Sequence, residues 1–580
     1  MFRALLFVVA AGLLACGVPA HAVRLQYDLP PYTDSAGSWH ELELPMRDGV
    51  KLHTRWMIPA GMEKAPVVVV RNPYNYAGLG IDVQCSVYVR YGIGCVVQDT
   101  RGRLESQGEW EPLIHEGDDG EDTLNWVAAQ PWSGEIALWG VSYLAATALA
   151  STRNPPAKLK TMVLEVFGVD LRQTMYERGL FHHELITAWT SFMPTREVPS
   201  LGHAEEVYRA ALSTRPFIDA DEKAIGHKLP FFRQWLQSMG PDDGVWATAQ
   251  PKEFYSVPER VKVPVLYIEG FDDPFLKAGL DTYARLASRK DSTLALLPVN
   301  HTGFQSGAVQ VDVDSLGMYT WTLSIPWLLH QLKGAPLPYE TGVVKSWPRG
   351  MKEPVTRPEW PGPVASKKLA LDPRVAQRWP CDQRALLEEE PAAGRVEYRY
   401  DPKHPWKSEG GARGLAYVIV NGVTPGPTRQ TWECRDDVVR FVTSDLAEPL
   451  HLLGTSKVRL KVRSSAPDTA FIAKLVDIDE KGRAFHVVDG GATLHWPTEE
   501  TRAPLKYAPG DERDVELDLF PTEWVLPKGH RLGLWISSSN FPMFSLHLNT
   551  EEPWYQASVF HLADQQIELG GSALELSVAP

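Results

Sequence analysis

Residues 135–150 read EIALWGVSYLAATALA, an apolar run followed by a serine on a glycine-containing turn and then by an alanine-rich segment. The apolar run is typical of a buried strand, and the alanines favour a helix. A serine on a sharp strand-to-helix turn has a strained backbone and presents its hydroxyl at the edge of a sheet, as a catalytic nucleophile requires. Such a turn needs small neighbours, and Gly140 and Ala145 flank Ser142 closely.

The spelling of this motif departs from the usual Gly-x-Ser-x-Gly, because Leu144 stands at the position of the second glycine. A lone Gly-x-Ser occurs in many proteins, so an ordinary turn serine is the alternative interpretation. The placement of Ser142 between a buried strand and a helix favours a nucleophile.

Apolar runs alternate with helical stretches on both sides of this serine. Further strands are predicted at residues 67–70, 94–98, 160–166, 263–269 and 293–298. Repeated strand–helix–strand units are typical of a mostly parallel sheet covered by helices, so the fold class is predicted to be α/β.

Two of these strands are followed by residues that can activate a serine. Asp272 and Asp273 follow one strand, and His301 follows the next. The carboxyl ends of parallel strands meet at one edge of the sheet, and the chain order Ser, Asp, His is that of strand-to-helix nucleophile enzymes. We therefore expect Ser142, Asp273 and His301 to meet, with Asp272 as the rival acid. A structural loop histidine is the alternative for His301.

The alternation is interrupted once and then ends, which divides the chain into parts. Residues 171–255 are aromatic and helical in character and are predicted to form a cap, inserted between two halves of the core at residues 23–170 and 256–345. Residues 346–580 begin with a proline-dense stretch and continue as short runs of alternating polarity, which favour an antiparallel β-sandwich.

The N-terminus has the layout of a secretory signal peptide. Arg3 precedes an apolar run at residues 4–15, and Ala20-His21-Ala22 resembles a cleavage site. Residues 1–22 are therefore expected to be removed on export to the periplasm or the medium. The apolar run is too short to span a bilayer as a helix. The sequence before Cys16 resembles a lipobox, so a lipid anchor at Cys16 is the alternative.

Composition argues against several classes of partner. The formal net charge is −14, so neither nucleic acid nor an anionic membrane surface is expected as a partner. The cysteines form no CxxC pair and no histidines stand at zinc spacing, so neither a metal nor another cofactor is predicted. In an oxidising compartment Cys381 and Cys434 are candidates for a disulfide, with buried free thiols as the alternative.

The chain also carries a series of short motifs in a fixed order. They are Arg71-Asn72-Pro73-Tyr74, Gln98-Asp99-Thr100-Arg101-Gly102-Arg103, Gly140-Val141-Ser142-Tyr143-Leu144, Gly270-Phe271-Asp272-Asp273, Asn300-His301, Ala466-Pro467-Asp468-Thr469, Lys474-Leu475-Val476-Asp477 and Ser538-Ser539-Asn540-Phe541-Pro542. In these motifs and their order the sequence resembles the cocaine esterase and X-Pro dipeptidyl-peptidase group, the CocE/NonD family. The resemblance covers nearly the whole mature chain. It implies an α/β-hydrolase core with an inserted helical cap and a C-terminal all-β jelly-roll sandwich.

The same resemblance assigns roles to residues. It implies Ser142 as nucleophile, Asp273 as acid and His301 as base, with an oxyanion hole made by the Tyr74 hydroxyl and the backbone N–H of Tyr143. The chain is accordingly expected to be a serine hydrolase that cleaves a carboxylic ester or amide, in a small molecule or a short peptide-like substrate, through an acyl-enzyme. X-Pro dipeptidyl-peptidase or acylase-type amide hydrolysis is the alternative. A non-catalytic binding protein on a hydrolase scaffold is an alternative from a different class.

Substrate selection is the point at which the sequence departs from some relatives. Those that hydrolyse α-amino acid esters place carboxylates soon after the triad aspartate to hold a substrate ammonium, whereas Pro274-Phe275-Leu276 follows here. Phe275 is expected to wall an apolar pocket instead. Trp189 of the predicted cap is a second candidate for the pocket wall.

Overall fold

The structure is a computed structural model that describes residues 29–33, 35–74, 80–302, 318–378, 380–388, 393–412, 414, 416–420 and 423–580. The predicted signal peptide at residues 1–22 and the alternative anchor at Cys16 lie outside these residues. In the described ranges, no helix is both long and apolar enough to cross a membrane.

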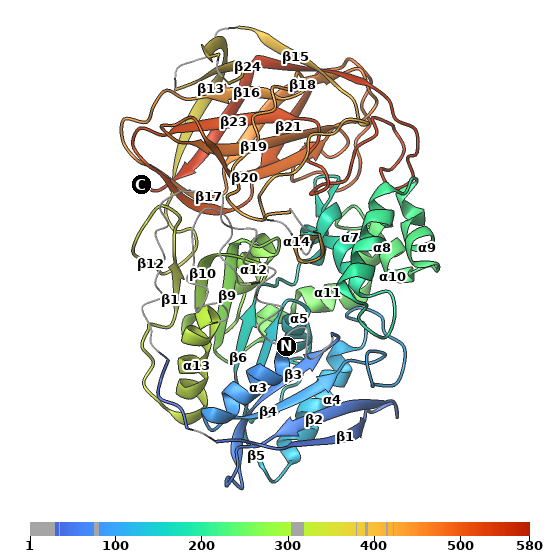
Figure 1. Ribbon diagram of the computed structural model, residues 1–580, viewed down its shortest axis with the longest axis vertical. Helices are drawn as coiled ribbons and strands as arrows, with labels where there is room; N and C mark the ends of the chain where they lie inside the picture. Colours follow the sequence, from blue (N-terminus) through green and yellow to red (C-terminus); the bar gives the residue numbers. More distant parts are fainter. Residues whose placement is uncertain are drawn as a thin grey trace.

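A mostly parallel sheet forms the centre of the N-terminal half (Figure 1). Its strand order is β1-β2-β4-β3-β5-β6-β9-β10-β11-β12, and the pairs from β4 to β11 are parallel. The strands are β1 (Trp39–Pro45), β2 (Lys51–Met57), β3 (Ala65–Asn72), β4 (Gly94–Asp99), β5 (Ser133–Val141), β6 (Leu159–Glu165), β9 (Val265–Asp272), β10 (Thr293–Asn300), β11 (Val343–Ser346) and β12 (Val355–Arg357). The α/β class predicted from the alternating apolar runs is confirmed. Because β12 pairs with β11, this sheet extends past residue 345, where the second half of the core was predicted to end.

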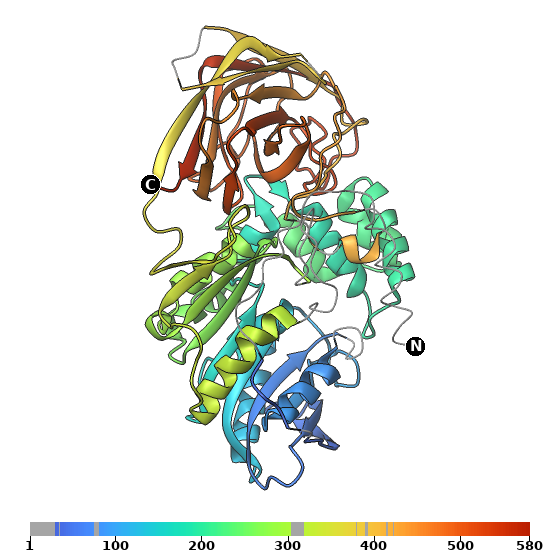
Figure 2. The same ribbon diagram turned by 60° about the vertical axis from the view of Figure 1, so that its left-hand side comes forward.

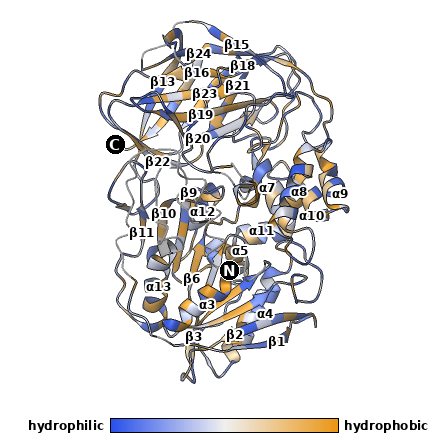
Figure 3. Ribbon diagram, viewed as in Figure 1, coloured by the Kyte–Doolittle hydropathy of each residue, from blue (hydrophilic) through white to orange (hydrophobic). Residues whose placement is uncertain are grey.

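Helices cover both faces of the sheet. They are α3 (Ile81–Arg90), α4 (Glu116–Ala129), α5 (Tyr143–Ala150), α12 (Leu276–Ala284) and α13 (Met318–Lys333). Alternate valines of β3 divide between two cores: Val67 and Val69 pack with α4, α5 and α12, whereas Val68 and Val70 pack with α3 and α13. This two-sided burial explains the continuous apolar runs, and the central strands are largely orange in Figure 3.

The segment between β6 and β9 is mainly helical and stands beside the sheet. It contains α6 (Leu171–Met175), β7 (Tyr176–Glu177), β8 (Leu180–Phe181), α7 (His183–Phe192), α8 (Leu201–Ser213), α9 (Ala220–Ile225), α10 (Pro230–Gln237) and α11 (Ala249–Tyr255). Aromatic residues from several of these elements pack together and against Trp554 and Tyr555 near the C-terminus. The cap is therefore in contact with the C-terminal part of the chain.

The C-terminal part is built on a second, antiparallel-rich sheet (Figure 2). Its strands are β13 (Ala365–Gln377), β14 (Gln383–Leu387), β15 (Arg395–Tyr400), β16 (Val439–Val442), β17 (Leu450–Gly454), β18 (Lys457–Ser464), β19 (Ala470–Ile478), β20 (Ala484–Thr493), β21 (Arg513–Asp518), β22 (Thr522–Leu526), β23 (Arg531–Ser537) and β24 (Ala563–Val578). Disulfides join Cys85 to Cys95 and Cys381 to Cys434, so the free-thiol alternative is wrong. The all-β class is confirmed, and the jelly-roll topology stays a prediction.

Candidate active site

Ser142 occupies the turn between β5 and α5 with φ 55° and ψ −127°, a conformation that non-glycine residues rarely adopt. Its backbone N–H donates to the Glu165 carbonyl at 2.9 Å. Gly140 is needed beside it, because a Cβ there would lie 2.2 Å from the carbonyl of Leu144. The turn thus has the strained geometry that the sequence predicts, although Leu144 replaces the second glycine.

His301 lies between Ser142 and Asp273. Its Nε2 is 3.0 Å from Ser142 Oγ, and its Nδ1 is 2.6 Å from Asp273 Oδ2. Asp273 is fully buried, and its other oxygen accepts the backbone N–H of Phe275 at 2.7 Å. The Phe275 ring stacks on the imidazole with centroids 5.4 Å apart. The structure therefore brings together the three side chains that the sequence singles out, in the order that proton transfer from the serine requires.

Asp272, the rival acid, points elsewhere and forms a buried ion pair with Arg349. The backbone of Arg349 pairs with Val525 of the C-terminal part, while the guanidinium reaches back to the core. Of the two adjacent aspartates, only Asp273 contacts the imidazole among the described residues.

Tyr74, which follows β3, lies close to Ser142. Its hydroxyl accepts a hydrogen bond from the indole N–H of Trp189 at 2.9 Å, and burial raises the pKa of the Tyr74 phenol to about 12. Hydrogen bonding with Trp189 and Ser142 opposes this rise. The Nε of Arg103 donates to the Pro73 carbonyl at 2.9 Å and so fixes the backbone just before Tyr74. The phenol remains a neutral donor close to the serine hydroxyl.

Tyr143 begins α5, so its backbone N–H is one of those that the helix itself leaves free to bind an anion. Its side chain is buried, and the hydroxyl donates to Glu116 Oε1 at 3.0 Å while it accepts the Leu113 N–H at 2.8 Å. Burial is the largest cause of a raised pKa at Glu116, and the charge of Arg71 opposes it.

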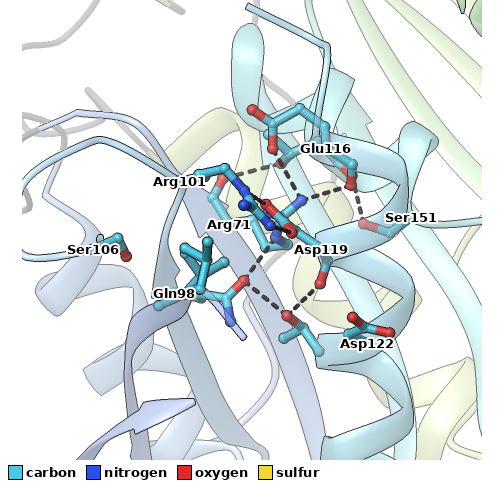
Figure 4. Close-up of polar contacts among 12 residues, drawn as sticks. Arg71, Gln98, Arg101, Ser106, Glu116, Asp119, Asp122 and Ser151 are labelled. Atoms are coloured by element: carbon cyan, nitrogen blue, oxygen red, sulfur yellow. Dashed lines mark hydrogen bonds and ion pairs between the residues drawn. The ribbon is translucent and has the colours of Figure 1, made fainter. Parts of the chain in front are cut away.

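A buried polar network supports Glu116 (Figure 4). Arg71 lies 3.0 Å from Glu116 Oε2 and also donates to Gln98 Oε1 at 2.9 Å. Arg101 binds Asp119 on α4 through two hydrogen bonds of 2.6 and 3.0 Å. Arg71, Gln98 and Arg101 belong to the sequence motifs at the ends of β3 and β4, and these contacts give the motifs a structural role: they hold α4 and, through Glu116, the first residue of the nucleophile helix.

A cavity of about 50 Å³ opens beside Ser142 and His301, with mainly apolar walls. They include Phe167, Leu171, Leu185, Ile186, Trp189 and Phe275. Trp189 and Phe275 were both expected in such a wall. A larger cavity of about 570 Å³ shares Leu113, Leu171 and Trp235 with the small one. Its walls carry both basic and acidic side chains, such as Lys252 and Glu177.

Sequence patterns did not reveal every residue that contributes to this site. The hydrogen bond from Trp189 to Tyr74 joins residues 115 positions apart, and no local pattern marks it. Arg349 lies in the proline-dense stretch that begins residues 346–580, and no local pattern marks its contact with Asp272. Tyr417, from the C-terminal part, hydrogen-bonds on both sides of His301 and also carries no sequence signal. No cluster of metal-ligating side chains occurs within the described ranges.

An α/β sheet with a serine on a strained strand-to-helix turn, contacted by a histidine, defines a serine hydrolase of the α/β-hydrolase type. Residues 48–303 match the family model for the X-Pro dipeptidyl-peptidase (S15 family), and residues 337–570 match the one for the X-Pro dipeptidyl-peptidase C-terminal non-catalytic domain. The chain therefore carries both the catalytic S15 domain and the C-terminal domain of these hydrolases, and the resemblance expected from its motifs is confirmed.

Individual relatives agree with this assignment. The cocaine esterase of Rhodococcus sp. (strain MB1 Bresler) is 27% identical over 540 residues, which cover 87% of this chain and 92% of the esterase. An α-amino acid ester hydrolase structure superimposes with a TM-score of 0.79 at 22% identity and covers 98% of this chain and 100% of its own. An aminopeptidase structure from a marine sediment Thaumarchaeota archaeon has a TM-score of 0.77 at 22% identity, covering 96% of this chain and 99% of its own. The last two likenesses concern the fold.

Proposed function

We propose that this protein hydrolyses carboxylic esters through an acyl-enzyme formed on Ser142. The observation that carries the proposal is the continuous hydrogen-bonded path from Ser142 Oγ through His301 to the buried carboxylate of Asp273. With the Nδ1–H of His301 donated to Asp273, Nε2 is unprotonated and faces the serine hydroxyl.

The reaction follows from this arrangement. His301 Nε2 takes the proton of Ser142 as the oxygen attacks the ester carbonyl, and Asp273 stabilises the imidazolium that forms. The Tyr74 hydroxyl and the Tyr143 N–H stabilise the oxyanion. His301 then protonates the leaving alcohol. In the second half a water molecule gives its proton to His301 and attacks the acyl-enzyme. The bond to Ser142 then breaks, His301 returns the proton to Ser142 Oγ, and the acid is released. These steps use only protein groups and water.

The walls of the small cavity favour an apolar acyl group without a charged amine. None of the described residues lining it is acidic, whereas a substrate with a free α-ammonium would need a carboxylate there. In the stretch just after Asp273, where some relatives that hydrolyse α-amino acid esters carry carboxylates, this chain has Pro274-Phe275-Leu276. This supports ester hydrolysis over removal of dipeptides from a free N-terminus, and amide hydrolysis of an uncharged acyl group is the second candidate.

Export is part of the proposal. The two disulfides, Cys85–Cys95 and Cys381–Cys434, fit an oxidising compartment, as does the N-terminal sequence with cleavage near Ala22.

The test compares wild type, Ser142→Ala and the exposed-serine control Ser213→Ala on matched p-nitrophenyl esters and p-nitroanilides. We expect faster turnover of esters, a loss of about 10⁴-fold or more in kcat for Ser142→Ala, and no loss for Ser213→Ala. A fluorophosphonate probe should label wild type and Ser213→Ala but not Ser142→Ala. Folded wild-type protein that takes up no label would instead support a non-catalytic binding protein.

A further inference from the structure

The helical turn α14 (Ala416–Ile419) belongs to the C-terminal part of the sequence but lies among the cap helices (Figure 2, orange among green). Its apolar side chains join a small core with α7 and α8. The members of this core in the described residues include Ala188, Ala204, Tyr208, Ala416, Ile419 and Val420. Packing against two cap helices fixes the position of the turn.

Gly414, which precedes α14, also packs closely against the cap. A Cβ at Gly414 would lie 2.7 Å from the Cα of Leu185, a residue that also lines the small cavity. Gly411 precedes α14 in the sequence and Gly426 follows it, and their backbones exchange two hydrogen bonds of 2.9 and 2.8 Å. Gly414 and α14, both from the C-terminal part, therefore lie beside the wall of the small cavity.

Tyr417 of α14 contacts the loop that carries His301. Its hydroxyl lies 3.2 Å from both Asn300 Oδ1 and Thr302 Oγ1 and accepts the backbone N–H of Thr302, also at 3.2 Å. Asn300 Oδ1 in turn accepts the Thr302 N–H at 3.0 Å and the Thr302 hydroxyl at 2.9 Å. These contacts enclose the turn whose central residue is His301.

The turn needs such support because β10 ends at Asn300, so the sheet no longer holds the backbone at His301. Asp273 and Phe275 orient the ring, but they act on the side chain alone. Proton transfer depends on the position of Nε2, and a displacement of about 1 Å in a reacting group can cost on the order of 100-fold in rate.

We propose that Tyr417 is a positioning residue, whose hydroxyl clamps the Asn300–Thr302 turn and so keeps His301 in line with Ser142. The inference rests on the proposed function of the Ser142 site. On this inference the C-terminal part contributes to the active site, because the Tyr417 phenol reaches the loop that carries His301. Burial raises the pKa of the Tyr417 phenol, so the hydroxyl stays a neutral donor.

Tyr417→Phe tests the clamp, because it removes the hydroxyl and keeps the ring. We expect kcat for a p-nitrophenyl ester to fall by about tenfold, with KM changed by less than about twofold, since the hydroxyl acts through His301 and not on the substrate. The rate of labelling of Ser142 by a fluorophosphonate should fall by a similar factor. Tyr208→Phe is the matched control: it removes a phenol from the same small core away from His301, and kcat should stay at the wild-type value.

Thr302→Val removes a second hydroxyl of the clamp at an exposed position. It tests the same turn without changing Tyr417. Its effect on kcat and that of Tyr417→Phe should combine to less than their product, because both loosen one turn. A Tyr417→Phe enzyme with wild-type kcat, or with a raised KM alone, overturns the inference, as does a fully multiplicative double variant. If Ser142→Ala keeps wild-type activity, the proposed function itself fails, which the Tyr417 variants alone do not show.

Discussion

The indole N–H of Trp189, on the cap, donates to the hydroxyl oxygen of Tyr74, at the end of a core strand, at 2.9 Å. With this donor in place, the Tyr74 oxygen receives one hydrogen bond and its own proton is directed away from the indole. The Trp189 ring also stacks on Tyr143, with centroids 6.1 Å apart. One cap residue therefore contacts both proposed contributors to the oxyanion hole.

Tyr74→Phe should lower kcat by about 100-fold, the usual loss when one oxyanion donor is removed. Trp189→Phe keeps an aromatic ring against Tyr143 but loses the donor to Tyr74, and we expect a smaller loss of about tenfold. In the double variant Trp189→Phe should add nothing, because the group that it orients is gone. Trp246→Phe, which removes an indole donor to the Ser238 carbonyl elsewhere in the cap, is the control with unchanged kcat. Steady-state kinetics of these variants on one ester is the measurement. If the losses in kcat of the two single variants multiply in the double variant, Trp189 does not act through Tyr74.

Substitutions at the neighbouring Asp272 and Asp273 should have different effects, one on stability and the other on catalysis. Asp273→Asn should lower kcat by about 10⁴-fold with little effect on folding, since the amide no longer stabilises the imidazolium of His301. Asp272→Asn leaves the buried guanidinium of Arg349 without its carboxylate and should lower the free energy of unfolding by about 3 kcal/mol. Its kcat should stay within about tenfold of wild type.

Denaturant unfolding and ester kinetics on both variants provide the measurement. If Asp272→Asn were the inactive enzyme and Asp273→Asn the unstable one, the assignment of the acid would be reversed.

Leu171 forms part of the wall common to the small and the large cavity. Leu171→Ala should open the acyl pocket toward the larger space, so that kcat/KM for p-nitrophenyl esters shifts toward longer acyl chains by about tenfold relative to acetate, the gain expected from a few newly buried methylene groups. Leu201→Ala, at a leucine exposed on α8, controls for the substitution itself. An unchanged chain-length profile would show that this wall does not limit the acyl group.

The sequence predicted the active site better than it predicted the contacts between parts of the chain. Ser142, Asp273 and His301 each follow a buried strand, and the topology of a parallel sheet brings such positions to one edge. Local patterns therefore sufficed to place them. Tyr417 reaches the site from the C-terminal part, and Arg349 reaches Asp272 from the connection between β11 and β12. Their partners are set by the docking of parts distant in sequence, which no local periodicity encodes.

The motif residues around Tyr74 also show what sequence alone does not reveal. The resemblance to a family indicated that Arg71 and Arg101 matter, but not why. Their role depends on a network of buried charges joining β3, β4 and α4. Such a network becomes visible only when the side chains are placed in three dimensions.

Glu165, whose carbonyl accepts the N–H of Ser142, is a buried carboxyl group with an unusual titration. Burial raises its pKa from 4.5 to about 7, and a hydrogen bond from the Trp139 indole opposes the rise. Between pH 4.5 and 7 the unfolded chain loses this proton while the folded protein keeps it, so Glu165 makes the protein less stable as the pH rises, with the full effect above pH 7.

Glu165→Gln removes this ionisation and retains an acceptor for Trp139. The variant should match wild type near pH 5 and exceed its free energy of unfolding at pH 8 by up to roughly 3 kcal/mol. Glu63→Gln, at an exposed position, controls for the loss of a negative charge. Chemical denaturation of the three proteins at both pH values is the measurement. Should wild type and Glu165→Gln keep the same difference at pH 5 and pH 8, Glu165 does not titrate in this range, and the contact between its strand and the nucleophile turn carries no dependence on pH.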